Sequence, residues 1–157
     1  MNVEILQRPE LRVASVRHIG PYNQITGAFE RLGELVAKSQ LTPEPGGLIA
    51  IFHDDPDAAP SAELRSDAGV VIPNDAALPP ELTEQRLPGG RYARTTHIGP
   101  YELLGDEWAR FIGEWLPTSG QELGPGVSYE LYRNTPMEVP KEELHTDLYL
   151  PLAPERP

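Results

Sequence analysis

The sequence predicts an α+β fold in which a strand–helix–strand–strand unit occurs twice along the chain. Three observations support this prediction. The pentapeptide His18–Tyr22 recurs without change as His97–Tyr101, 79 positions later. The segment Glu63–Asp67 aligns with Glu143–Asp147 at a spacing of 80 positions. The same order of hydrophobic periodicities runs through both halves, so the chain is interpreted as a tandem duplication.

The two repeats are placed at about residues 1–74 and 84–152. The segment 75–90 lies between them, and its Pro-Pro and Pro-Gly-Gly clusters are typical of a linker. A chain of 157 residues has the length of one ordinary domain. We therefore expect residues 1–157 to form a single domain whose two repeats are joined by a Pro- and Gly-rich segment.

Each repeat begins with an apolar, alternating run, which predicts a strand at residues 11–19 and another at residues 92–98. A Gly-Pro pair ends each run. Proline fits the start of a helix because its missing N–H has no helical partner there. A helix is therefore expected to follow each of these two strands.

The helices are predicted from apolar residues that recur at steps of four, three and four. In the first repeat these are Ile25, Phe29, Leu32 and Val36, and in the second Leu104, Trp108, Phe111 and Trp115. Such spacing places one apolar stripe on one helix face, with charged residues opposite.

Two further strands are predicted in each repeat, at residues 47–53 and 64–73 and at residues 127–133 and 144–152. One unit alone would leave sheet edges open, and two units pairing edge to edge would form one continuous antiparallel sheet. Both helices are expected on one face of that sheet. The other face is expected to form a ligand groove, because ligand sites often lie where two halves meet.

The composition excludes several classes of function. Acidic residues number 24 and basic residues 13, which gives a net charge of −11 and disfavours direct binding to nucleic acids or anionic membranes. The chain has no cysteine, so disulfides, thiol catalysis and cysteine-based zinc sites are excluded. Neither a signal peptide nor a membrane-spanning stretch is recognised. A cytoplasmic protein with cationic partners is expected.

The candidate ligand residues follow from strand alternation in residues 127–133. The apolar set with Val127 and Leu131 is expected to pack under the helices, which would direct Ser128, Glu130 and Tyr132 into the groove. Glu130 is interpreted as a counter-ion for organic cations or as a general acid/base. The alternative is a solvated glutamate on an open sheet face, paired with an arginine such as Arg94 across the strands.

The first repeat provides a comparison within the chain, because Ala50 is the residue that aligns with Glu130 at the spacing of 80. A carboxylate is therefore not required at this strand position. The expected ligand contacts in the groove are Ser128, Glu130, Tyr132, Ala50, Phe52, Tyr92, Trp108 and Tyr149. Trp108 also lies on the apolar helix stripe and is interpreted mainly as a core residue.

The residues that both repeats retain are expected to be structural. His18 and His97 precede a Gly-Pro pair, which suits a hydrogen bond that shapes the turn, and no metal-binding spacing is present. Asp67 and Asp147 also recur. No nucleophile elbow, phosphate-binding loop or dinucleotide fingerprint is found, so neither a metal nor a cofactor is expected.

The ordered set of these segments resembles the GyrI-like small-molecule-binding domains, which also form the effector-binding part of some multidrug-sensing transcription regulators. The resemblance rests on the two strand–HIGPY–helix segments, the strand Tyr129–Asn134 and the closing segment Glu143–Leu152, and it covers about residues 2–152. It implies a duplicated fold with a ligand cleft between the halves. It also implies a glutamate on the middle strand of the second half that meets cationic or amphipathic ligands, a position that Glu130 occupies.

Three functions follow as hypotheses. The first is a stand-alone module, more a binder than an enzyme, that holds small hydrophobic or cationic molecules with Glu130 as counter-ion. The second is a hydrolase of strained electrophilic genotoxins, as the resemblance implies for some members, in which Glu130 activates water and Tyr132 polarises the leaving group. The third is an inhibitor of DNA gyrase, as the resemblance also implies, acting through the acidic surface. No helix-turn-helix is recognised, which disfavours direct action as a transcription factor.

Overall fold

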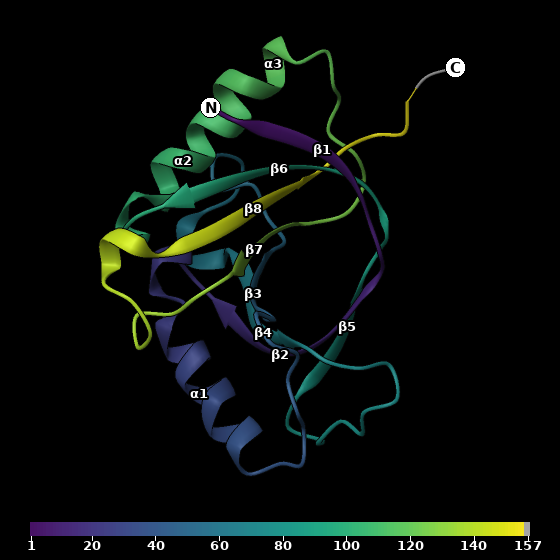
Figure 1. Ribbon diagram of the computed structural model, residues 1–157, viewed down its shortest axis with the longest axis vertical. Helices are drawn as coiled ribbons and strands as arrows, with labels where there is room; N and C mark the ends of the chain where they lie inside the picture. The colour runs from purple at the N-terminus through teal and green to yellow at the C-terminus, as the bar shows by residue number, and fades with distance from the viewer. Residues whose placement is uncertain (156–157) are drawn as a thin grey trace. The chain divides into compact units, whose positions relative to one another are not determined.

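The computed structural model describes residues 1–155, and the chain divides into two compact units. Unit 1 contains Met1–Pro9 and the chain from Pro88 onward, and unit 2 contains Glu10–Leu87. Among the described residues there are eight antiparallel strands and two main helices, one in each unit (Figure 1). The α+β class and the duplicated arrangement that the sequence predicts are confirmed.

Unit 2 is a four-stranded antiparallel sheet in the order β3-β4-β2-β5 with one helix. Its elements are β2 (Leu11–Ile19), η1 (Tyr22–Gln24), α1 (Thr26–Ala37), β3 (Leu48–Phe52), η2 (Ser61–Glu63), β4 (Arg65–Val71) and β5 (Thr83–Leu87).

Unit 1 has the matching order β1-β6-β8-β7. Its elements are β1 (Val3–Arg8), β6 (Gly90–Ile98), η3 (Tyr101–Leu103), α2 (Leu104–Arg110), the π-helical η4 (Phe111–Trp115), α3 (Leu116–Thr118), β7 (Ser128–Tyr132), η5 (Lys141–Glu143) and β8 (His145–Pro151).

The two repeats exchange their first strands, which the sequence analysis did not predict. Strand β1 begins the first repeat but pairs with β6 of the second, and β5 begins the second repeat but pairs with β2 of the first. The proposed linker, residues 75–90, is therefore wrong in part, because β5 and the start of β6 lie within it. Pro9 and Pro88, which follow the exchanged strands at the same spacing of 79, were an available sequence signal.

The second helix differs from the prediction of one regular helix over residues 104–115. It begins as α2, passes through the π-helical turn η4 and ends in the short α3. Pro117 has no amide hydrogen and therefore cannot continue the α-helical hydrogen-bond ladder. The wider π turn lies just before this proline and carries Phe111 and Trp115.

Each helix covers one face of its own sheet. In unit 2, Leu32 and Leu35 of α1 pack with Ala14, Ala68 and Val70 of the sheet. In unit 1, residues of the second helical segment pack in the same way, with Leu104 and Phe111 against Ala93, Leu148 and Leu150. The apolar stripes predicted from helical spacing therefore form the core of each unit.

The repeated pentapeptide forms the same turn in both units. Gly20 and Gly99 adopt φ values of +128° and +134°, in a region that favours glycine. The Nε2 of His18 lies 2.9 Å from the carbonyl oxygen of Pro21, and the Nε2 of His97 lies 3.1 Å from that of Pro100. A carbonyl oxygen only accepts, so each Nε2 carries the proton and donates it. The predicted turn-shaping role of both histidines is confirmed.

Gly69 provides a test of how closely the strands of unit 2 pack. A Cβ atom at this position in β4 would lie 2.5 Å from Cγ1 of Val13 and 3.2 Å from Cγ2 of Ile49. We expect Gly69→Ala to lower the free energy of unfolding by about 1–3 kcal/mol through overpacking, as measured by urea denaturation.

Gly33 of α1 is the matched control, because a Cβ atom there meets nothing within 4 Å. Gly33→Ala should raise stability by about 0.5–1 kcal/mol, since glycine is unfavourable inside a helix. Equal stability of the Gly69→Ala variant and the parent would contradict the close packing described for β4.

Candidate functional site: a buried carboxylate without a cation

Strand β7 places two polar side chains on the face that the helix of unit 1 covers. Glu130 and Tyr132 are two residues apart and so share a face. Glu130 lies opposite Leu148 of β8, and Leu148 belongs to the cluster that packs on α2 and η4. Glu130 therefore points toward the second helical segment and is only 5% exposed.

Both oxygens of the Glu130 carboxylate accept a hydrogen bond. The indole Nε1 of Trp108 donates to Oε2 at 2.6 Å, and the hydroxyl of Tyr132 donates to Oε1 at 2.7 Å. Trp108 comes from α2, so the helix and the strand together hold the carboxylate. Three of the residues predicted to bind ligand are thereby brought together.

This arrangement corrects the predicted faces of β7. The set with Val127 and Leu131 was expected under the helices and Glu130 on the opposite face, whereas Glu130 faces the helix and Leu131 lies on the other face with Tyr129. The prediction was wrong because Tyr129 is buried as completely as an aliphatic residue would be, at 1% exposure, on the other face. Glu130 is buried beside the helix because Trp108 and Tyr132 satisfy both of its oxygens.

Aromatic rings surround the carboxylate and its donors. The ring of Tyr101 meets Tyr132 edge-on at 5.5 Å between centroids. The ring of Phe111 stacks on Trp108 at 5.8 Å between centroids and also contacts Trp115 of η4 at 5.5 Å. The aromatic faces carry a negative quadrupole and therefore favour a nearby cation.

The environment makes ionisation of Glu130 unfavourable. Burial raises the pKa of its carboxyl above the ordinary value, while the hydrogen bonds from Tyr132 and Trp108 and the nearby His97 lower it in part. Burial and the adjacent Glu130 also raise the pKa of Tyr132 well above its ordinary value. The phenol thus stays protonated and keeps donating to the carboxylate.

Glu130 differs from the other buried carboxylates of the described chain in having no cationic partner. Asp67 pairs with Arg17 at 2.7 Å and with His53, and Asp147 pairs with Arg133 at 2.7 Å. Glu107 is the remaining buried acid, and it pairs with Arg110 and lies 3.8 Å from His97.

The partners of Asp67 also favour its ionised form. Burial opposes the ionisation of Asp67, but the hydrogen bonds from His53 and Arg17 prevail and lower its pKa. The prediction that Asp67 and Asp147 are structural agrees with these pairings. No ion pair among residues 1–155 includes Glu130, and the nearby His97 offsets only part of the cost of its negative charge.

The face opposite the helix in unit 1 holds two of the predicted ligand residues, Tyr92 and Tyr149, away from Glu130. Both rings contact Tyr129, at 5.5 Å and 4.8 Å between centroids. The guanidinium of Arg8 lies 4.6 Å from the centre of the Tyr149 ring. Burial raises the pKa of Tyr129 to about 12. These tyrosines form a packed aromatic cluster that Arg8 covers.

The remaining predicted residues are placed as follows. Ser128 shares the face of Glu130 at the start of β7. Ala50 and Phe52 lie in unit 2, where Ala50 is fully buried opposite Ala68 and the ring of Phe52 lies 4.9 Å from Tyr22.

The alternative of a solvated Glu130 paired with Arg94 is wrong. Arg94 lies on the opposite face of unit 1 and pairs with Glu4 at 3.0 Å. Glu130 is buried and bonded to Trp108 and Tyr132 instead.

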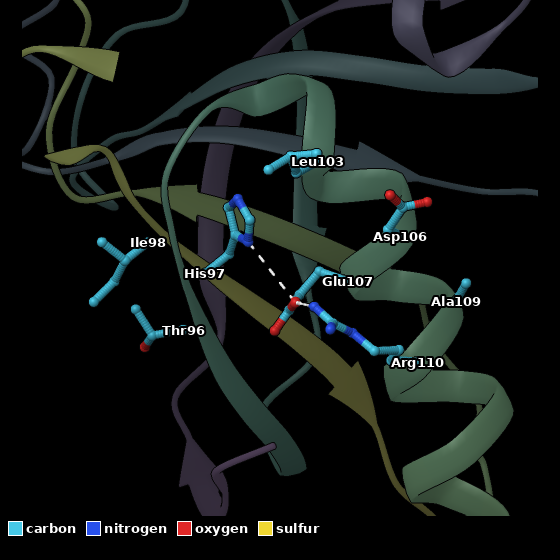
Figure 2. A pocket seen from close by; sticks show the side chains of 8 residues that line it. All are labelled: Thr96, His97, Ile98, Leu103, Asp106, Glu107, Ala109 and Arg110. Atoms are coloured by element: carbon cyan, nitrogen blue, oxygen red, sulfur yellow. Dashed lines mark hydrogen bonds and ion pairs between the residues drawn. The ribbon is translucent and has the colours of Figure 1, made fainter. Parts of the chain in front are cut away.

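A pocket of about 690 Å³ lies on the outer side of α2, next to the end of β6 (Figure 2). Figure 2 shows His97 directed at Glu107, which in turn contacts Arg110. Two carboxylates line this pocket, Asp106 and Glu107, and Glu107 is already paired, unlike Glu130. His97 lines the pocket, and its proximity to Glu130 lowers the pKa of that carboxyl in part.

Tyr101 and His97 are neighbours of the buried carboxylate that the sequence did not indicate. Both belong to the repeated pentapeptide, in which only the histidine was given a role, that of shaping the turn. Among the described residues, no group of three or more histidine, aspartate or glutamate side chains is arranged to hold a metal ion. Likewise, none of the helices in residues 1–155 is long and apolar enough to span a membrane.

Comparisons with known proteins identify the family. The model of the GyrI-like small molecule binding domain matches residues 1–153. A protein named DNA gyrase inhibitor from Erwinia billingiae is 31% identical over 157 residues, which cover 98% of each chain.

Solved structures share the fold. The C-terminal domain of EcmrR superposes with a TM-score of 0.82 at 18% identity, over 97% of each chain. SAV2435 bound to tetraphenylphosphonium gives 0.72 at 13% identity, over 98% of this chain and 94% of that one. A hydrolase from Listeria innocua gives 0.64 at 14% identity, over 96% and 91%.

The chain therefore belongs to the family of GyrI-like small-molecule-binding domains. The fold is that of the C-terminal domain of EcmrR, as the resemblance in the sequence implied.

The raised pKa of Glu130 predicts a specific pH dependence of stability. A carboxyl whose pKa is higher in the folded state binds its proton more tightly there, so its contribution is full at low pH and is lost as pH rises through the raised pKa. We expect the melting temperature of the parent to fall relative to that of Glu130→Gln as pH rises from about 4 upward.

The measurement is the difference between the two melting temperatures across a pH series. The contributions of the other titrating groups are shared by the two proteins and cancel in this difference. A difference that stays constant, or that changes in favour of the parent as pH rises, would show that burial does not raise the pKa of Glu130.

Proposed function

We propose that this protein binds small hydrophobic organic cations, and that Glu130 is the counter-ion for the cationic group. The observation that supports the proposal is the unpaired charge: the other buried carboxylates have arginine or histidine partners, and Glu130 has only the neutral donors Trp108 and Tyr132. Leaving a buried charge without a partner is unfavourable, and an arriving cation removes that cost.

The surroundings of Glu130 favour an organic cation over a hydrated metal ion. The rings of Trp108, Tyr132 and Tyr101 provide aromatic surface, and each face adds about 0.5–2 kcal/mol of attraction to a cation. Both Trp108 and Tyr132 can keep donating to Glu130 while the ligand approaches, so binding does not require their bonds to break.

Membership of a small-molecule-binding family is consistent with this assignment. The structural relative SAV2435 is bound to tetraphenylphosphonium, which is a lipophilic cation. This is the reason for choosing a lipophilic cation as the probe for this chain.

The proposal predicts charge-dependent stabilisation by ligand. Phenylbutylammonium should raise the melting temperature, with a gain that follows RT ln(1 + [L]/Kd) and reaches about 2.7 kcal/mol at a concentration of 100 Kd. The neutral phenylbutanol should give a much smaller shift. Glu130→Gln should abolish the difference between the two probes.

Glu107→Gln is the matched control, because Glu107 is a buried acid of the same unit whose charge is already paired. It should keep the preference for the cation. If Glu130→Gln binds phenylbutylammonium as tightly as the parent does, the counter-ion role is wrong. Phenylbutylammonium has no hydrolysable bond, so the hydrolase alternative is tested with a cyclopropane-bearing electrophile, whose recovery unchanged, by mass spectrometry, would support binding without turnover.

The hydrolase alternative finds less support in the geometry. The hydroxyl of Tyr132 donates to Glu130 at 2.7 Å, so the proton that was expected to polarise a leaving group is engaged by the carboxylate. We therefore propose a binding protein without turnover as the main function.

A second candidate function is inhibition of DNA gyrase. The observation that favours it is the relative named DNA gyrase inhibitor, which matches 98% of this chain at 31% identity. The charge of −11 offers a mechanism, since an acidic surface can occupy a site that binds DNA.

If charge mimicry operates, purified protein should reduce supercoiling by gyrase, and added salt should weaken the effect because it screens exposed charges. A supercoiling assay at several salt concentrations measures this. Inhibition that does not change with salt would contradict mimicry, and unchanged supercoiling at every salt concentration would remove gyrase as a partner.

A further inference from the structure

The hydroxyl of Thr146 is a buried polar group that the described part of the chain leaves without a hydrogen-bond partner. Thr146 lies in β8, its exposed fraction is 0%, and its Oγ1 contacts neither donor nor acceptor among the described residues. Buried polar atoms are normally hydrogen-bonded, because losing water without replacement is costly. The hydroxyl therefore indicates a partner that residues 1–155 do not supply.

The strand register places this hydroxyl beside the Glu130 site. Thr146 pairs with Tyr132 of β7 on one side and with His97 of β6 on the other. Glu130 pairs with Leu148, so Thr146 and Glu130 are diagonal neighbours on the same helix-covered face. Diagonal neighbours are roughly 7–8 Å apart between Cα atoms. Both side chains thus border the same stretch of the helix-covered face.

The polar groups around Thr146 are already engaged with other atoms. His97 donates its Nε2 proton to the carbonyl oxygen of Pro100. Tyr132 and Trp108 donate to Glu130. The donor and the acceptor capacity of the Thr146 hydroxyl are thus both unused among the described residues, beside a carboxylate that lacks a cation.

The first repeat has the same hydroxyl without the acid. Ser66 aligns with Thr146 at the spacing of 80, is also 0% exposed, and its Oγ has no partner among the described residues. It pairs with His18 and Phe52, and the residue aligned with Glu130 is Ala50. A buried water molecule suits such a site in either unit. Only in unit 1 is the hydroxyl next to an unpaired carboxylate.

We infer that Thr146 is the second polar contact of the cation site and accepts a hydrogen bond from the ammonium group whose charge Glu130 balances. The ligands are therefore amines that are protonated and still carry an N–H, and the site disfavours quaternary ammonium ions. A quaternary centre brings the same charge but no donor, and its methyl groups would leave the hydroxyl unsatisfied. This inference rests on the proposed cation-binding function and assigns its ligand class.

The test compares phenylbutylammonium with its trimethylammonium derivative, which differ at the cationic centre in having or lacking an N–H. Calorimetric affinities are measured for the parent, Thr146→Val, Thr146→Ser and Ser66→Ala. The parent should bind the N–H ligand more tightly. Thr146→Val, which replaces the hydroxyl with a methyl group, should lose about tenfold in affinity for phenylbutylammonium and none for the quaternary ligand. Thr146→Ser keeps the hydroxyl and should keep the preference, and Ser66→Ala should match the parent.

Several outcomes would overturn the inference. If Thr146→Val weakens both ligands equally, the residue acts through packing. If it changes neither, the hydroxyl holds a water molecule, as we expect for Ser66. In both cases cation binding by Glu130 stands. If neither ligand binds the parent, the proposed function fails and the inference fails with it. Melting curves of each variant establish that it is folded.

Discussion

The site depends on one interaction, the burial of the Glu130 carboxylate between neutral donors and without a cation. Trp108 and Tyr132 satisfy its oxygens but cannot neutralise its charge. Burial therefore raises its pKa and leaves the folded protein with an unfavourable charge whenever the carboxyl ionises. A bound cation relieves that cost, so the same feature that weakens the free protein favours ligand binding. Neither surface ion pairs nor the net charge of the chain reproduces this effect, because solvent screens them.

The duplicated scaffold explains how such an unfavourable group is tolerated. In unit 2 the position aligned with Glu130 is Ala50, which packs in a core with no charge. The buried aspartates, by contrast, occur in both units and each has an arginine partner, Arg17 for Asp67 and Arg133 for Asp147. Residues shared by both repeats hold the sheets and turns together. Glu130 occurs in one repeat alone, so the shared scaffold does not require it.

The sequence predicted most of the fold because the duplication doubled each signal. The repeated pentapeptide, the helical stripes and six of the strands were recognised from residue patterns. Strand β5 was missed because it is largely polar, and β1 because it precedes the strand–helix–strand–strand pattern that the repeat revealed. Their pairing with the other repeat depends on long-range contacts that no local pattern encodes. The face of Glu130 was also mispredicted. Alternation divides the residues of β7 into two sets but does not say which set faces the helix when both are buried. The hydrogen bond from Trp108 to Glu130 depends on how the helix packs on the sheet, which the spacing of residues along the sequence cannot predict.

The most direct test of the central claim is a carbon-13 NMR titration of the Glu130 side-chain carboxyl, assigned by comparison with Glu130→Gln. In the free protein its midpoint should lie above that of ordinary glutamates, and saturating phenylbutylammonium should lower it, because a neighbouring cation favours the ionised form. A midpoint at the ordinary value that does not move with the ligand would contradict the claim that Glu130 is a buried, unpaired charge that awaits a cation.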